Sequence, residues 1–223
     1  MNKILLETVK LQKKYDHKNG VIELFESVNI KIKRGELVAL VGPSGSGKSS
    51  FLHLLALLDN PTKGKILLNN KDTRNLSEEE KNLKRRNDIS IIFQDNNLLT
   101  DFTALENVIM PLIIKGENTG SATEKAKKLL KDVKILNRIN HFPNELSGGE
   151  QQRVAIARAL ISETNLILAD EPTGNLDIDT SRSVFDYFMR YTKENNCAVV
   201  MATHNEELAK LANKRIIIGD NDE

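Results

Sequence analysis

Residues 42–49 have the types and spacing needed to hold a chain of phosphate groups. They read Gly-Pro-Ser-Gly-Ser-Gly-Lys-Ser and match the pattern G-x-x-x-x-G-K-[ST] at every fixed position. The glycines allow a tight turn in which successive backbone N–H groups point inward at phosphate oxygens. In such a loop Lys48 reaches the β- and γ-phosphates of a nucleotide, and the hydroxyl of Ser49 is a ligand for Mg²⁺.

The sequence on either side supplies the context that this loop requires. Leu37–Val41 is a short, continuous apolar run, typical of a strand buried on both faces, and residues 51–58 have the pattern of a helix. A helix that begins near Lys48 turns the positive end of its dipole toward the same anion. A Gly- and Ser-rich turn that matches by chance is the alternative, and this context argues against it. We therefore expect a nucleoside triphosphate to be bound by Gly42, Pro43, Ser44, Gly45, Ser46, Gly47, Lys48, Ser49 and Ser50.

A second apolar strand, Leu166–Asp170, ends in two acidic residues, because Glu171 follows Asp170. Ligand sites in open α/β sheets lie beyond the carboxyl ends of the strands, which is where these acids fall. Asp170 is suited to hold Mg²⁺, and Glu171 can orient or deprotonate an attacking water. The two could instead cap the turn at residues 172–174 or pair with lysines. The phosphate loop upstream favours the catalytic interpretation.

Residues 146–153, Leu-Ser-Gly-Gly-Glu-Gln-Gln-Arg, predict a second anion site. Ser147, Gly148 and Gly149 offer a hydroxyl and N–H groups at the start of an amphipathic helix, and a helix N-terminus attracts negative charge. One chain does not need two such sites for a single triphosphate. A two-fold dimer does, if each copy closes on the nucleotide of the other. A Ser-Gly-Gly helix cap by itself would mean little.

Strands and helices alternate along most of the chain, which predicts an α/β fold with a parallel sheet and right-handed crossovers. Capping-box patterns mark helix starts at Ser77, Thr103 and Ser121, each with a glutamate three residues later. Residues 95–160 are dominated by helical signals, with a loop at 116–120, and resemble an inserted subdomain. The expected strands are residues 8–12, 28–33, Leu37–Val41, 64–68, 89–93, Leu166–Asp170, Ala198–Ala202 and 215–218, and further helices are expected at 180–194 and 206–212.

The composition limits the classes of partner. The chain has 223 residues, of which 32 are basic and 31 acidic, so its net charge of +1 gives no support for nucleic-acid binding. A single cysteine, Cys197, rules out an internal disulfide and a multi-cysteine metal site, which fits a reducing compartment. We see no apolar core of a signal peptide, and the longest mostly apolar run, residues 51–58, is far shorter than the ~20 residues that span a membrane. We therefore expect a soluble chain, and any membrane role must come through a partner.

Residues 146–153 resemble the LSGGQ signature of ATP-binding-cassette (ABC) ATPases, in the form LSGGEQQR, and the resemblance extends over residues 4–218. It implies a P-loop NTPase (RecA-like) core, with a mostly parallel sheet and an antiparallel β subdomain, formed by residues 1–94 and 161–223. It also implies an α-helical subdomain inserted at about residues 95–160. The implied activity is hydrolysis of ATP with Mg²⁺ by a homodimer. The implied partners are integral membrane permease subunits, reached from the cytoplasmic face of the inner membrane.

The resemblance assigns roles to further residues. Tyr15 matches the aromatic residue that stacks on adenine, although a tyrosine in a surface loop is the alternative. Gln94 matches the glutamine that contacts Mg²⁺ and water, and Asp177 belongs to a segment, Asn175-Leu176-Asp177, that matches the dimer seam. His204 matches the histidine that contacts the γ-phosphate. The implied catalytic residues are Glu171, His204 and Lys48, and the implied metal ligands are Ser49, Gln94 and Asp170.

Several segments resemble the ATPases of the lipoprotein-releasing and macrolide-exporter group, among them residues 97–99, 103–107 and 169–177. The implied function is a transporter ATPase for lipoprotein release, with antibiotic or peptide efflux, or a non-transport role in cell division, as alternatives. The chain departs from the pattern of the group at Asn205, where an aspartate is usual. A DNA-repair or translation role is disfavoured, because a long coiled-coil insertion or a tandem cassette would be expected for it.

Three expectations concern residues outside the nucleotide site. The basic residues of segment 81–86 (Lys81, Lys84, Arg85 and Arg86) are expected to form a solvated helix face. The apolar residues just after Gln94 (Leu98, Phe102 and Leu105) are hypothesised to form a groove in which a permease helix docks. His17, His53 and His141 lack the spacing of metal ligands and are expected to have surface or packing roles.

Overall fold

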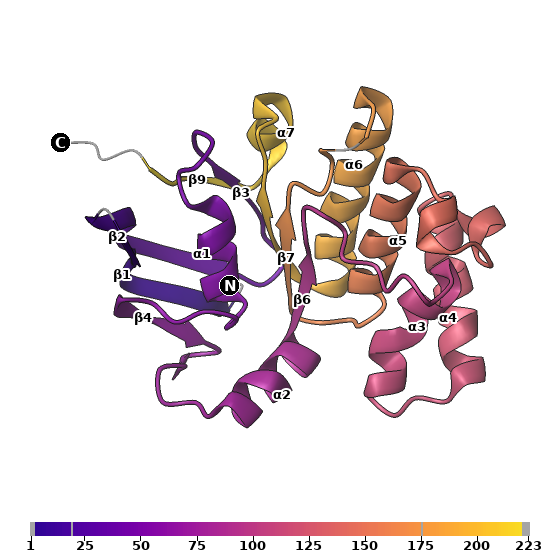
Figure 1. Cartoon of the computed structure of the whole chain (residues 1–223), viewed down its shortest axis with the longest axis horizontal. Coiled ribbons are helices and arrows are strands. Elements are labelled where there is room, and N and C mark those ends of the chain that lie inside the picture. The colour runs from indigo at the N-terminus through magenta and orange to yellow at the C-terminus, as the bar shows by residue number, and fades with distance from the viewer. Residues whose placement is uncertain (1–2, 19, 175, 220–223) are drawn as a thin grey trace.

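The computed structural model describes residues 3–18, 20–174 and 176–219 of the chain. A five-stranded parallel sheet forms the centre of this part (Figure 1). The strand before the phosphate loop and the strand that ends at Asp170 belong to this sheet, separated by one strand. The prediction of a parallel α/β fold is therefore confirmed. In spatial order the strands are β6 (Ile89–Ile92), β7 (Leu166–Asp170), β8 (Ala198–Ala202), β3 (Leu37–Val41) and β9 (Lys214–Ile217).

A second, antiparallel sheet has four strands. Its two longest strands have 14 residues each and pair along their whole length, which makes them much longer than the short alternating patterns at residues 8–12 and 28–33 predicted. The partner strand supplies hydrogen bonds to segments that carry no apolar alternation of their own. In spatial order the strands are β2 (Gly20–Lys33), β1 (Ile4–His17), β4 (Lys63–Leu68) and β5 (Lys71–Asp72).

Of the three helix starts that capping-box patterns predict, the structure confirms two. Ser77 and Thr103 each accept a hydrogen bond from the N–H of the glutamate three residues later, which confirms both capping boxes. Ser121 is inside its helix, because Asn118 is the cap and its side chain accepts from Gly120 N–H at 2.8 Å. The predicted helix start at Ser121 is therefore wrong. The helices are α1 (Lys48–Leu55), α2 (Glu78–Asp88), α3 (Ala104–Ile114), α4 (Thr119–Asp132), α5 (Gly148–Leu160), α6 (Ile178–Asn195) and α7 (Glu206–Leu211).

The parallel sheet separates two hydrophobic cores, because alternate residues of a strand face opposite sides. Leu166 and Leu168 of β7 pack with α1 and the antiparallel sheet. Ile167 and Ala169 pack on the other side, in the core that α5 and α6 cover. Figure 1 shows α1 beside the antiparallel sheet and α3, α4 and α5 gathered at the opposite end of the molecule. This layering places the two predicted anion sites, at the starts of α1 and α5, on different sides of the sheet.

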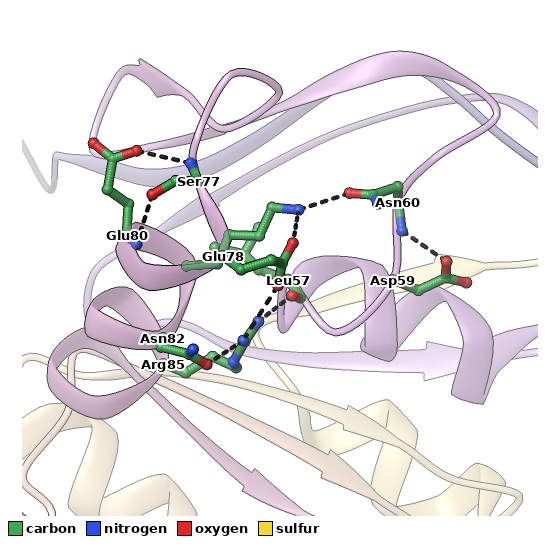
Figure 2. A network of polar contacts seen from close by, with 9 residues as sticks. Leu57, Asp59, Asn60, Ser77, Glu78, Glu80, Asn82 and Arg85 are labelled. Atoms are coloured by element: carbon green, nitrogen blue, oxygen red, sulfur yellow. Dashed lines mark hydrogen bonds and ion pairs between the residues drawn. The ribbon is translucent and has the colours of Figure 1, made fainter.

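The basic segment of α2 is only in part a solvated face. Lys81 is 8% exposed, and its ammonium donates to Asn60 Oδ1 at 3.0 Å and to Glu78 at 2.7 Å. Arg85 donates to the carbonyl of Leu57, as Figure 2 shows. The expectation of a solvated face is wrong for these two residues, because the turn after α1 presents the carbonyl of Leu57 and the side-chain oxygen of Asn60 to α2. The result is that α2 anchors the far end of the helix that carries the phosphate loop.

Candidate nucleotide-binding site

The phosphate loop connects β3 to α1 and depends on glycine at two positions. Gly42 and Gly47 have φ of 152° and 91°, in the region that L side chains rarely adopt. A Cβ at Gly42 would lie 2.2 Å from the carbonyl oxygen of Ile218, and one at Gly47 would lie 3.0 Å from Leu24 Cβ. Side chains at these positions would therefore push the loop away from β2 and from the end of β9.

Lys48 lies across the inside of the loop. It is 6% exposed, and its ammonium donates to the carbonyl oxygens of Gly42 at 3.0 Å and Pro43 at 2.8 Å. The hydroxyl of Ser46 is also buried and has no hydrogen-bond partner among the described residues. A buried ammonium and an unpaired hydroxyl in a loop rich in N–H groups suit a polyphosphate. Ser49 and Ser50 follow on the first turn of α1, both half-buried.

A hollow of about 410 Å³ lies against this loop. Pro43, Ser44, Gly45 and Ser46 form one wall, residues 23–26 of β2 form the other, and Gly219 completes it. Tyr15 does not line this hollow. Its hydroxyl donates to Asp59 at 2.8 Å, the ammonium of Lys13 lies 4.5 Å from its ring centroid, and its side chain is partly exposed. The adenine-stacking role of Tyr15 stays a prediction.

Asp170, the last residue of β7, and Glu171, which follows it, lie at the carboxyl edge of the sheet, as predicted. Asp170 is 9% exposed. Glu171 has φ of 47°, an uncommon value for a residue with a side chain, and its N–H donates to the carbonyl of Ala202 in β8 at 3.0 Å. Strained backbone of this kind costs on the order of 1–3 kcal/mol and persists where the surroundings determine it. Here it turns the chain sharply at the carboxylate of Glu171.

His204 meets Glu171 across the ends of β7 and β8. Its Nε2 lies 2.7 Å from Glu171 Oε1, and the two side chains are 47% and 23% exposed. Gln94 follows β6, the other neighbour of β7, and its side chain is exposed. Because parallel strands end at the same edge, the structure brings four predicted site residues to the carboxyl edge of the sheet: Gln94, Asp170, Glu171 and His204.

Ser147 caps α5 in a complete capping box. Its hydroxyl accepts from Glu150 N–H at 3.3 Å, and Glu150 accepts in return from Ser147 N–H at 2.8 Å. Backbone hydrogen bonding from Ser147 is the main cause that lowers the pKa of Glu150. Helix geometry leaves the N–H groups of Gly148 and Gly149 without an acceptor in α5. A Cβ at Gly148 would have no atom within 4 Å, so this surface is open in the single chain.

Asp177 caps the next helix, α6, and accepts from Thr180 N–H at 3.0 Å. A hydrogen bond with the side chain of Thr180 is the main cause that lowers the pKa of Asp177, and the bond from the Thr180 N–H lowers it further. Asn175, which the sequence placed with Asp177 at the dimer seam, lies outside the described residues. The phosphate loop and the two acidic residues thus follow strands of one sheet. Ser147–Gly149 do not lie at the phosphate loop of the same chain, because α5 and α1 pack on opposite faces of that sheet.

Two residues that the sequence interpretation missed hold the segment after Gln94. Arg158 of α5 donates to the carbonyls of Asn96 and Asn97, and Asn107 of α3 bonds to residues 99, 102 and 103. Each is a polar residue at an apolar position of its helix: Arg158 follows Val154 by four residues, and Asn107 follows Ala104 by three. A lone polar residue on an apolar stripe is the signal that could have identified them.

Comparison with known proteins agrees with this arrangement. The chain is 48% identical to the lipoprotein-releasing system ATP-binding protein LolD of Rickettsia bellii, over 96% of this chain and 94% of the relative. It is 42% identical to the protein of that name from Legionella pneumophila, over 98% and 96%. A solved dimeric ATP-binding cassette in a post-hydrolysis state with ADP and phosphate superimposes with a TM-score of 0.92 at 38% identity, over 96% and 94%. The sequence model of the ABC transporter family matches residues 25–174, and the chain belongs to this family as an ATP-hydrolysing subunit.

Proposed function

We propose that the chain binds ATP in the hollow beside the phosphate loop and hydrolyses it as a dimer. The proposed core is formed by residues 1–94 and 161–223, and the proposed helical subdomain by about 95–160. In the dimer, Ser147, Gly148 and Gly149 of one copy would close on the nucleotide of the other. The separation of the α1 and α5 N-termini within one chain supports this, as does the dimeric state of the cassette with ADP and phosphate.

The observation that carries the proposal is the 2.7 Å contact between His204 and Glu171, the residue that follows Asp170. Glu171 would accept the proton of the attacking water, while His204 holds its carboxylate and faces the γ-phosphate. Lys48 would stabilise the negative charge that develops on the phosphoryl oxygens. Ser49, Gln94 and Asp170 offer oxygen atoms, which suit Mg²⁺, an ion that would supply charge neutralisation at the phosphates.

The names of the relatives support lipoprotein release as the transported process. Among the described residues no helix is long and apolar enough to cross a membrane. We propose that the chain is a peripheral subunit on the cytoplasmic face of the inner membrane, bound to a permease. Release of lipoproteins from that membrane would then be driven by closure and reopening of the ATPase dimer.

A groove of about 440 Å³ between α2, β6 and α3 is the proposed seat of the permease. The apolar side chains that line it include Phe93, Leu99, Met110, Pro111 and Ile114. Of the three residues that the sequence suggested for this groove, Leu98 and Leu105 pack against the core. The third, Phe102, is 37% exposed but does not line the groove. The apolar surface of the groove therefore combines residues of α3 with Phe93 and Leu99, which lie on either side of Gln94.

The proposal is tested by isolating the chain from native membranes and identifying the permease that accompanies it. Reconstitution with that permease in lipid vesicles should show ATP-dependent release of lipoproteins. Ile114→Glu should abolish release and leave ATP hydrolysis by the free subunit unchanged. Ile113→Glu is the matched control on the same helix, since Ile113 is exposed but does not line the groove. A permease that exports antibiotics or peptides, or one that moves no substrate, would contradict lipoprotein release.

A further inference from the structure

Gln94 lies at the edge of the parallel sheet, but the segment that follows it is held by hydrogen bonds from helix α5. Arg158 donates through Nη1 to the carbonyl oxygen of Asn97 at 2.7 Å and through Nη2 to that of Asn96 at 2.6 Å. Asn96 and Asn97 have φ of 59° and 46°, so both adopt the left-handed conformation. Two consecutive residues in that conformation turn the chain sharply, and their carbonyls converge on one guanidinium.

The other end of this segment is fastened as well. Asn107, which is fully buried in α3, donates to the carbonyls of Leu99, Phe102 and Thr103 at 2.9–3.1 Å and accepts from Leu99 N–H at 2.8 Å. Residues 96–103 are therefore held from both ends by side chains of α5 and α3. A displacement of these helices carries the segment with it.

Water cannot easily replace the hydrogen bonds between Arg158 and the carbonyls of Asn96 and Asn97, because the guanidinium is largely buried. Burial lowers the pKa of the guanidinium, and the side chain lies in the wall of the apolar groove beside Leu99. A planar guanidinium presents two parallel donors to two acceptors, which an ammonium on a flexible stem does not. Ser147, Gly148 and Gly149 lie at the other end of α5, three turns away on the same helix.

We propose that Arg158 is a positioning residue that makes the Gln94 segment move as one body with α5. Closure of the Ser147–Gly149 end on a nucleotide then sets the position of Gln94 at the active edge of the sheet. A permease seated in the groove acts on the same guanidinium from the other side. The role of Gln94 in this inference rests on the proposed function.

The test is a double-mutant cycle between Arg158 and Gln94 in the purified full chain, with initial rates of phosphate release measured against ATP and against Mg²⁺. Arg158→Lys should lower kcat by about tenfold, with the KM for ATP changed less than about twofold and the apparent KM for Mg²⁺ raised, as in Gln94→Ala. In the Gln94→Ala background, Arg158→Lys should have no further effect on kcat. Losses of kcat that multiply in the double variant, or an unchanged requirement for Mg²⁺, would show that Arg158 does not act through Gln94.

Lys115→Gln is the matched control, because Lys115 also donates to a carbonyl, that of Ser162 at 2.6 Å, on the same group of helices. It should leave kcat and both KM values unchanged. Amide hydrogen exchange gives a readout that does not need hydrolysis: exchange in residues 95–99 should accelerate in Arg158→Lys and in Arg158→Gln, but not in Lys115→Gln. Unchanged exchange in this segment would overturn the inference even if the protein hydrolyses ATP. Absence of hydrolysis by the native chain would overturn the proposed function instead.

Discussion

The imidazole Nε2 of His204 lies 2.7 Å from the carboxylate Oε1 of Glu171, although the two residues are 33 positions apart in the sequence. Each follows the end of a parallel strand, β7 for Glu171 and β8 for His204, and the two strands are neighbours in the sheet. The sharp backbone turn at Glu171 and its hydrogen bond to Ala202 hold the carboxylate on the side of His204. The contact therefore depends on sheet register, and it fixes the group proposed to accept the proton of water.

His204→Ala should lower kcat on the order of 10²-fold, because the carboxylate of Glu171 loses the partner that orients it. Equilibrium binding of ATP should change less than about twofold, since the phosphate loop stays intact. The measurements are phosphate release at saturating ATP and titration calorimetry with ATP. Asn205→Asp is the control: Asn205 caps α7 by accepting from Leu208 N–H, a bond that aspartate can also make. Full activity of His204→Ala would show that the pair has no part in hydrolysis.

Two glycine substitutions should separate stability from function. The Cβ that Gly42→Ala adds would clash with the carbonyl of Ile218, and the positive φ at this position strains any residue with a side chain. The free energy of unfolding should therefore fall by about 1–3 kcal/mol or more. Gly148→Ala meets no atom within 4 Å, so its melting temperature should equal or exceed that of the native chain. Its ATP hydrolysis should nevertheless fall steeply, because the added methyl group would lie between the helix N-terminus and the nucleotide of the other copy. Thermal unfolding and phosphate release on both variants check this. A fully active Gly148→Ala would argue against the composite site.

The features that were predictable from sequence are those with local causes. The capping boxes at Ser77 and Thr103 form as the pattern predicts, because donor and acceptor are three residues apart in one chain segment. The helix start predicted at Ser121 is wrong for an equally local reason. Asn118, three residues earlier, caps the helix, and the hydroxyl of Ser121 donates to Glu117 instead. The strand before the phosphate loop, β3, and the strand that ends at Asp170, β7, are predictable from the sequence because both are continuous apolar runs.

The features that were not predictable depend on residues far apart in the chain. Arg85 reaches Leu57 and Arg158 reaches Asn96 only after the fold has formed, and no spacing rule joins such positions. The contact between Tyr15 and Asp59 has the same character, because it joins a strand of the antiparallel sheet to the turn after α1. The roles of the phosphate-loop residues, Gln94 and Asp177 in binding nucleotide remain predictions.

Lys81 and Lys84 offer a matched pair for the link between α1 and α2. Lys81 is buried and donates to Asn60 and Glu78, whereas Lys84 is partly exposed and pairs with Asp88. Lys81→Met should lower the free energy of unfolding by about 2 kcal/mol, because charge-assisted hydrogen bonds are lost. Lys84→Met should lower it by less than about 0.5 kcal/mol, as for a surface pair. Urea unfolding followed by circular dichroism measures both. Equal effects would mean that α2 does not anchor the end of α1.

Cys197 should be inert in the folded chain. It is 1% exposed, and burial raises the pKa of its thiol to about 12. The thiolate is the reactive form, so at pH 8 almost none is present in the folded state, and reagent access is blocked as well. Reaction with a thiol-specific disulfide reagent should be absent at pH 8 and become complete in denaturant. Rapid reaction of the folded chain would show that the Tyr191–Cys197 region opens readily.

The central claim is that Glu171 activates water for ATP hydrolysis in a dimer of this chain. Its most direct test is phosphate release by Glu171→Gln at saturating Mg²⁺ and ATP, with sedimentation velocity on the same sample. The variant should bind ATP, sediment as a dimer and release phosphate at a rate at least about 10²-fold below that of the native chain, because the amide cannot accept the proton. Turnover at the native rate, or a monomer with ATP bound, would contradict the account.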